Sequence, residues 1–296
     1  MIIGSELLNF EENSRDNSKI GILAMIFGSI CFSLMSAMVK YLSDLPLLEI
    51  IFFRSIPIMV IIPLILKNKK IPFWGNNKPL LLLRSLISFI VIVAYYYSIK
   101  AINLTDAVSI KQLSPFFVII LASILLGEKI FFKNIIIFIL AFLGSLLIIK
   151  PGFRLDIFPV IIGLFGAILT GGSQVALRQL RLTDHPLVIV NYLGYILGLI
   201  SFGVLLWEGN FCIPDKSHLL ILVLMGLAGL GAQFALTKAY QIAPANLISV
   251  YSYLQIIFSA WLGIFFFKEI PDLFSIFGVS LIIISGYSNY KLRGKI

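Results

Sequence analysis

Ile26-Phe27-Gly28-Ser29-Ile30, in the first half of the chain, resembles Leu164-Phe165-Gly166-Ala167-Ile168 in the second half. A basic residue, Lys40 or Arg178, follows twelve residues after the glycine in each stretch. Self-similarity at corresponding positions is typical of a structural unit that occurs more than once in a chain. The sequence therefore indicates two copies of one unit.

Both stretches lie within long apolar segments, and such segments fill most of the chain. Of the 296 residues, 59% are hydrophobic and 12% are charged, and the mean hydropathy is +1.03. An average soluble chain carries about 25% charged residues, whereas a helix of about 20 apolar residues suits the hydrocarbon core of a membrane. Ten membrane-spanning helices are predicted, at residues 20–42, 47–66, 79–100, 104–127, 132–150, 158–180, 186–206, 218–240, 244–267 and 272–290.

The connections between these segments are short, so neighbouring helices are expected to run antiparallel. Each half holds an odd number of helices, so the second copy enters the membrane from the opposite face. We expect an all-α polytopic membrane protein with ten transmembrane helices as two inverted five-helix repeats, at residues 20–150 and 158–290. Residues 1–19 and 291–296 flank the repeats as cytoplasmic segments.

The formal net charge of +9 reflects 23 basic and 14 acidic residues. Most basic residues lie in short gaps between apolar segments, where they orient the chain in the membrane, and nucleic acid is not expected as a partner. The gaps on the side of the two termini are the more basic, which predicts cytoplasmic termini in a cytoplasmic (inner) membrane protein. Residues 1–19 lack the features of a signal peptide, and we expect them to be unstructured.

Motifs for catalysis, metals and cofactors are absent from the sequence. There is no Gly-x-x-x-x-Gly-Lys-[Ser/Thr] loop for phosphate binding. His185 and His218 lie at segment edges without the neighbours that a zinc site or a Ser-His-Asp triad needs, and Cys31 and Cys212 have no metal-binding spacing. The sequence predicts a protein that is not an enzyme and has no catalytic residue, metal or cofactor.

Charged residues within apolar segments are the first candidates for a binding site, because a Lys or Arg at mid-membrane costs roughly 2.5–3.5 kcal/mol. Arg54 suits a carboxylate or phosphate; the alternative is an internal ion pair, although Glu49 lies on another helix face. Lys111 and Gln112 precede Pro115, which predicts a local break beside a cavity or packed protein. Snorkelling to the membrane surface is the alternative for Lys111.

Uncharged side chains extend this set. Gln174 and Asn191 are candidate cavity residues, and close helix packing is the alternative for their segments. Tyr251 and Gln255, four residues apart, are expected on one helix face. Tyr96 either stacks on a flat ligand or belongs to an interfacial aromatic belt. The candidate substrate-binding or gating residues are Arg54, Lys111, Gln112, Tyr96, Gln174, Asn191, Tyr251 and Gln255.

Charged residues near segment ends are interpreted differently. Lys40, Arg84 and Lys238 are expected to snorkel to the membrane surface. Glu269, beside Lys268, is expected to cap the next helix or to pair locally.

Several motifs resemble the EamA-like branch of the drug/metabolite transporter superfamily, over residues 20–290. They are Arg54, Ser114-Pro115, Leu126-Gly127-Glu128, Lys150-Pro151-Gly152, Tyr253-Leu254-Gln255 and Phe267-Lys268-Glu269. The Lys-Pro-Gly ending and Arg84 resemble the subgroup of S-adenosylmethionine and riboflavin importers. The resemblance implies ten helices around a central cavity. The second half has Ile256 in place of Pro115, so no matching break is expected there, and it has Gly194 in place of Arg54.

The sequence therefore predicts a secondary transporter that moves a small organic metabolite by alternating access. The metabolite is expected to be anionic or zwitterionic, and the aromatic residues allow a flat ring. A coupling proton or a counter-substrate, and membrane lipid, are the other expected partners. The alternatives are a non-transporting membrane scaffold, in which Arg54, Lys111 and Gln174 pair internally, and a lipid-handling protein with an opening between helices.

Overall fold

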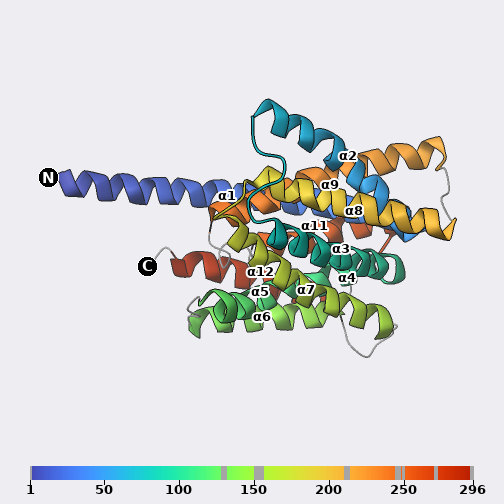
Figure 1. The fold of residues 1–296 in the computed structure, drawn as a ribbon. Helices are drawn as coiled ribbons and strands as arrows, with labels where there is room; N and C mark the ends of the chain where they lie inside the picture. Colours follow the sequence, from blue (N-terminus) through green and yellow to red (C-terminus); the bar gives the residue numbers. More distant parts are fainter. Residues whose placement is uncertain are drawn as a thin grey trace.

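A computed structural model describes residues 2–127, 132–149, 157–209, 214–243, 248, 251–269 and 273–293, and the regular structure in these ranges is helical. The helices are α1 (Ile2–Tyr41), α2 (Leu47–Asn68), α3 (Lys78–Ala101), α4 (Leu104–Lys111), α5 (Ser114–Leu126), α6 (Phe132–Ile149), α7 (Ile157–Leu180), α8 (Pro186–Glu208), α9 (Lys216–Ile242), α11 (Leu254–Phe267) and α12 (Leu273–Arg293). They form one bundle, in which α1 begins and α12 ends on the same side (Figure 1). Glu128, Lys150-Pro151-Gly152 and Cys212 lie outside the described residues.

Seven helical segments of the described chain are long and apolar enough to cross a membrane. They are Ser18–Tyr41, Leu47–Asn68, Lys78–Ala101, Leu104–Leu125, Phe158–Leu180, Pro186–Glu208 and Lys216–Ile242. Shorter apolar helices lie at Ile135–Gly144, Leu254–Phe267 and Ile276–Ser285.

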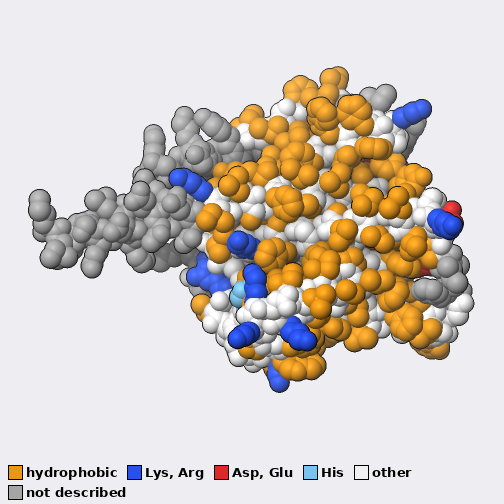
Figure 2. Space-filling model, turned by 90° about the horizontal axis from the view of Figure 1, so that it is seen from above, with side chains coloured by type: hydrophobic (Ala, Val, Ile, Leu, Met, Phe, Trp, Pro, Cys, Tyr) orange, Lys and Arg blue, Asp and Glu red, His pale blue; other side chains and the backbone are white. Residues whose placement is uncertain are grey.

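The surface of the bundle is apolar. Large side chains such as Leu23, Leu64 and Trp207 are exposed, and hydrophobic side chains cover most of the face in Figure 2, with Lys and Arg toward its ends. Soluble monomers rarely expose apolar patches of such extent. The expected fold class, an all-α polytopic membrane protein, is therefore confirmed.

The start of α1 differs from the prediction. The helix begins at Ile2, so the expectation that residues 1–19 are unstructured is wrong for residues 2–19. Each residue added to an existing helix gains a hydrogen bond without a new nucleation cost, so a membrane helix extends readily beyond the apolar segment.

The fourth predicted span consists of two helices, because the chain turns at Gln112–Leu113 between α4 and α5. The break expected before Pro115 is therefore present. A second turn, at Tyr253, separates helical residues 251–252 from α11, and the Ile256 N–H donates to the Tyr253 carbonyl at 2.9 Å. The expectation of no break in the second half is wrong, because a tight i to i+3 bond satisfies the backbone there without a proline.

The most extensive helix contacts in the described chain join its two halves. They pair α1 with α9, α2 with α8, α3 with α7 and α6 with α12. α9 also packs against α2 through a glycine: a Cβ on Gly226 would lie 2.7 Å from Pro57 Cγ and 3.2 Å from the Phe53 carbonyl oxygen. The halves therefore interlock along their lengths.

Replacing Gly226 with Ala is expected to destabilise the bundle by about 1–3 kcal/mol, the usual cost of overpacking, because the proline ring and the carbonyl cannot move aside cheaply. Gly203→Ala in α8 is the matched control, since nothing lies within 4 Å of the added Cβ. Thermal unfolding in detergent checks both. Equal stability of the two variants would contradict the close α2–α9 contact.

Candidate functional site

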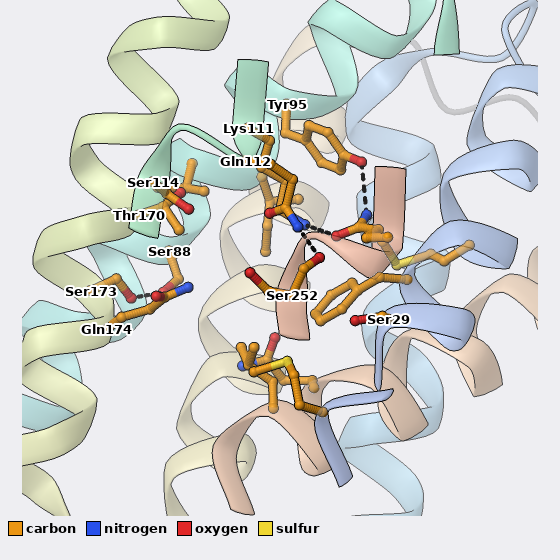
Figure 3. A pocket seen from close by; sticks show the side chains of 18 of the residues that line it. Ser29, Ser88, Tyr95, Lys111, Gln112, Ser114, Thr170, Ser173, Gln174 and Ser252 are labelled. Carbon is orange, nitrogen blue, oxygen red and sulfur yellow. Dashed lines mark hydrogen bonds between the residues drawn. The ribbon is translucent and has the colours of Figure 1, made fainter. Parts of the chain in front are cut away.

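A cavity lies between the two halves, with a volume of about 80 Å³. It is lined from α1, α2, α3, α4, α7 and α9 and from the segments around the two helix breaks (Figure 3). A water molecule needs roughly 10–15 Å³ on the same measure, so the cavity has room for several water molecules in this conformation. Its polar and charged lining residues are Ser29, Arg54, Arg84, Ser88, Tyr95, Lys111, Gln112, Ser114, Thr170, Ser173, Gln174, Gln233, Ser252 and Gln255.

One face of α3 forms a wall of this cavity. Arg84, Ser88, Ile92 and Tyr95 follow each other at spacings of four, four and three residues, which is the spacing of one helix face. The Ser88 hydroxyl lies 2.7 Å from the Ser173 hydroxyl of α7. The wall thus joins a buried cation at one end to an aromatic side chain at the other.

Lys111 lies at the break between α4 and α5. Its Nζ donates to Gln255 Oε1 at 3.2 Å and lies 4.4 Å from the centroid of the Phe32 ring and 4.6 Å from that of the Tyr95 ring. Aromatic faces attract cations, so the two rings hold the ammonium group at the cavity. Lys111 therefore lines the cavity.

A hydrogen-bond chain links the two helix breaks at this point. Gln255 Nε2 donates to the Tyr95 hydroxyl at 3.3 Å, and that hydroxyl lies 2.8 Å from Ser36 Oγ. Gln112 Nε2 donates to the Ser252 carbonyl (Figure 3). A side-chain amide thereby satisfies a backbone group beside the second break, where no helix bond is available.

Arg54, on α2, is 2% exposed and lines the cavity. Its Cζ lies 5.5 Å from the centroid of the Tyr96 ring, and its Nε has no hydrogen-bond partner among the described residues. Gly229 makes space for the guanidinium, since a Cβ there would lie 3.1 Å from Arg54 Nε. The site thus contains a buried guanidinium with a free donor.

Arg84 is the functional candidate that sequence reasoning missed. It is also 2% exposed, lines the cavity, and has no hydrogen-bond partner for Nε and Nη1 in the described chain. The expectation that it snorkels to the surface is wrong, because its helix face points into the bundle. The signal was its spacing of four residues from Ser88 and eleven from Tyr95, which places all three on one face.

The structure brings five of the eight predicted site residues to the cavity: Arg54, Lys111, Gln112, Gln174 and Gln255. Gln174 also accepts a hydrogen bond from the Tyr240 hydroxyl at 2.8 Å. Besides Arg84, several uncharged lining residues are missing from the predicted set: Ser29, Ser88, Ser114, Thr170, Ser173, Gln233 and Ser252. Uncharged side chains cost much less than charged ones within a membrane, so they do not stand out in the sequence.

Three predicted residues do not line the cavity. Tyr96 is fully buried behind Arg54, and Asn191 is buried in α8, where its amide atoms have no hydrogen-bond partner among the described residues. The backbone carbonyl of Tyr251 accepts from Ser29 Oγ at 3.4 Å. The argument that Tyr251 shares a helix face with Gln255 is wrong, because the turn at Tyr253 interrupts the helix between them.

An ion pair between Lys40 and Glu269 joins α1 to the end of α11. Lys40 Nζ also donates to the Ile102 carbonyl at 3.3 Å, and Glu269 Oε2 accepts from the Leu104 N–H, at the start of α4, at 3.1 Å. The expectations that Lys40 snorkels and that Glu269 pairs locally with Lys268 are wrong. The Glu269 carboxylate instead contacts the Lys40 ammonium group and the first N–H of α4.

Among the described residues, the cavity lining contains three basic side chains and no acidic one. In a background without Cys31 and Cys212, Ser88→Cys is therefore expected to react about tenfold faster with a negatively charged methanethiosulfonate reagent than with a positively charged one, because a cationic cleft concentrates anions. The rates are measured by quenching the reaction at timed intervals and determining the fraction of modified protein by mass spectrometry. Ser201→Cys, buried in α8 outside the cavity, is the control and should stay unmodified. Equal rates for the two reagents at position 88 would contradict a cationic cavity.

The chain is similar to several known proteins. The chain is 34% identical over 274 residues to the pseudopaline exporter CntI of Pseudomonas aeruginosa, covering 91% of this chain and 95% of that protein. The S-adenosylmethionine uptake transporter of Rickettsia prowazekii is 26% identical over 266 residues, covering 89% of this chain and 90% of that one. Solute carrier family 35 member G1 of Mus musculus is 30% identical over 287 residues, covering 90% and 77%.

The fold is also found in a solved crystal structure, which matches with a TM-score of 0.74 at 15% identity and covers 95% of this chain and 98% of that chain. The sequence model of the EamA-like transporter family matches twice, over residues 19–150 and 157–289. The named relatives are transporters rather than enzymes. The chain is therefore a multi-pass membrane transporter, and it belongs to the EamA-like transporter family of the drug/metabolite transporter superfamily.

Proposed function

We propose that this protein is a secondary transporter that carries a small anionic or zwitterionic metabolite across the cytoplasmic membrane by alternating access. One observation carries the proposal: Arg54, Arg84 and Lys111 line a cavity within a lipid-facing helix bundle, and none of the described residues that line this cavity is acidic. Buried cations are costly unless an anion pairs with them. A substrate with an acidic group meets that need.

The proposal includes ten transmembrane helices in two inverted five-helix repeats, at residues 20–150 and 158–290. In these repeats α7, α8 and α9 are the counterparts of α1, α2 and α3. The packing pattern supports the repeats, because a twofold exchange of counterparts converts the α1–α9 contact into the α7–α3 contact and leaves the α2–α8 contact unchanged. The two family matches divide the chain at the same place. A helix break in each half, at Gln112–Leu113 and at Tyr253, also agrees.

Both termini are proposed to lie in the cytoplasm, with residues 1–19 and 291–296 as cytoplasmic segments. The distribution of charge supports this orientation, because basic residues favour the cytoplasmic side of membrane helices. On the side of the termini, the connections and helix ends contain Lys67, Lys69, Lys70, Lys78, Lys129, Lys133, Arg178 and Arg181, and the terminal segments add Arg15, Lys19, Lys291, Arg293 and Lys295. The opposite side has Lys40, Lys100, Lys150, Arg154, Lys216 and Lys268.

Alternating access requires that one end of the cavity closes while the other opens. In the proposed orientation the Lys40–Glu269 ion pair lies at the outer end of the bundle, where it links α1, α11 and the start of α4. Outward opening must separate these groups, so the pair stabilises the outward-closed state. A gradient of a coupling proton or of a counter-substrate sets the direction. The relatives include both an exporter and an uptake transporter, so the proposal leaves the direction open.

The aromatic lining is compatible with a flat ring in the substrate, since Phe32 and Tyr95 flank Lys111 and rings stack on such faces. The alternative of a membrane scaffold requires Arg54, Lys111 and Gln174 to pair internally without a cavity. Lys111 and Gln174 have partners, but all three residues line the cavity, which favours a carrier. The alternative of a lipid-handling protein has one feature in its favour, an apolar pocket of about 310 Å³ between α1, α9 and α11. No charged side chain among the described residues lines that pocket to bind a lipid headgroup, so the carrier remains the better fit.

Arg54→Ala and Lys111→Ala are each expected to lower transport about tenfold or more, because a hydrogen bond to a charged group contributes about 1.5–3 kcal/mol. Hits from a thermal-shift panel of anionic and zwitterionic metabolites, tested as radiolabelled flux into proteoliposomes, provide the measurement. Lys238→Ala, on an exposed position of α9, is the control. Normal flux in both cavity variants, with equal insertion, would remove them from the site.

Reversing the charge of either Lys40 or Glu269 is expected to lower flux, since like charges then repel across the closed end. The double variant Lys40→Glu/Glu269→Lys restores the pair and should recover at least half of the lost flux. Lys268→Glu, beside Glu269 but exposed, serves as the control and should have little effect. Additive losses in the double variant would show that the pair has no role in closure.

A further inference from the structure

Building on the proposed transport function, we infer that the substrate is an organic dianion whose two acidic groups bind at opposite ends of the cavity. Lys111 and Arg54 hold one group, and Arg84 holds the other. The acidic groups are carboxylates or phosphates, since both accept hydrogen bonds from guanidinium and ammonium donors.

The first end of the cavity has hydrogen-bond donors that no described residue uses. In the described chain Lys111 makes one hydrogen bond, to Gln255 at 3.2 Å, and an ammonium group has three N–H donors. Arg54 lines the same cavity and has a free Nε. The Phe32 and Tyr95 rings restrict Lys111 from both sides. An acidic group that enters here meets two fixed cations.

The second end is set by Arg84, which is far from the first end along α3. Lys111 contacts Tyr95, and Tyr95 is eleven residues from Arg84, which corresponds to about 16 Å along a helix. Arg84 is nine-tenths or more buried, and two of its guanidinium nitrogens have no acceptor in the described residues. Two acidic groups, one at each end, would therefore pair with both sets of donors.

The rest of the lining is uncharged: it combines apolar side chains such as Ile92 with the polar side chains of Ser88, Ser173, Gln174 and Gln233. These side chains suit the neutral body of a substrate, and they offer no negative charge to pair with a cationic centre. A monoanion leaves one end of the cavity without any counter-charge, and a buried unpaired charge is strongly unfavourable. A dianion brings one acidic group to each end, so the arrangement favours two separated acidic groups.

The test is a binding titration on the purified full-length chain in nanodiscs, by calorimetry and thermal shift, without any transport step. The probes are glutarate, adipate, pimelate and suberate, each with its monomethyl ester, together with a phosphonocarboxylate of matched length to distinguish phosphate from carboxylate. At least one dianion is expected to bind tenfold or more tightly than its monoester, with putrescine giving no shift.

Arg84→Gln is expected to remove this preference: the dianion weakens about tenfold, while the affinity of the monoester stays the same. Arg84→Lys should restore part of the preference, and Lys238→Gln should leave it intact. Equal binding of dianion and monoester, equal loss of both in Arg84→Gln, or no binding of any dianion to correctly folded protein would each overturn the inference. Binding without flux in proteoliposomes would instead count against the transport proposal, so the two failures are distinguishable.

Discussion

Every backbone N–H and C=O group inside a membrane must find a partner within the protein, because lipid tails offer none. This constraint explains why the described chain is helical and why the two interruptions, at Gln112–Leu113 and Tyr253, occur where they do. Both lie against the cavity, and the Gln112 side chain bonds the Ser252 carbonyl beside the opposite interruption. The irregular backbone is thus supported by polar side chains, and the same groups make the cavity polar.

The lack of water in the membrane interior also determines which side chains lie beside the buried cations. The cavity lining holds Arg54, Arg84 and Lys111 without an acid, and rings rather than carboxylates lie beside two of them: Tyr96 at Arg54, and Phe32 and Tyr95 at Lys111. A cation–π contact offsets part of the cost of burial but neutralises no charge. The positive potential therefore persists in the cavity and is available to a ligand. Glu269, which pairs with Lys40, lies at the end of the bundle and outside the cavity lining.

The helices were predictable because their apolar lengths are a direct consequence of membrane thickness, and the positions of Arg54 and Lys111 were predictable because buried charge is costly. Arg84 was misjudged because distance from a segment end says nothing about which face a residue occupies. Tyr251 was misjudged because a turn at Tyr253 resets the helical register. The pair between Lys40 and Glu269 joins residues 229 positions apart, and a single sequence contains no signal for such a contact.

The interlocking of the halves has a consequence for how the protein is made. α1, α2 and α3 find their main partners in α9, α8 and α7, all of which leave the ribosome later. Until the later helices are inserted, the surfaces of α1, α2 and α3 that will contact them face lipid. Assembly is therefore completed only after synthesis nears its end, and a truncated product that stops after the first half is a natural target for membrane proteases.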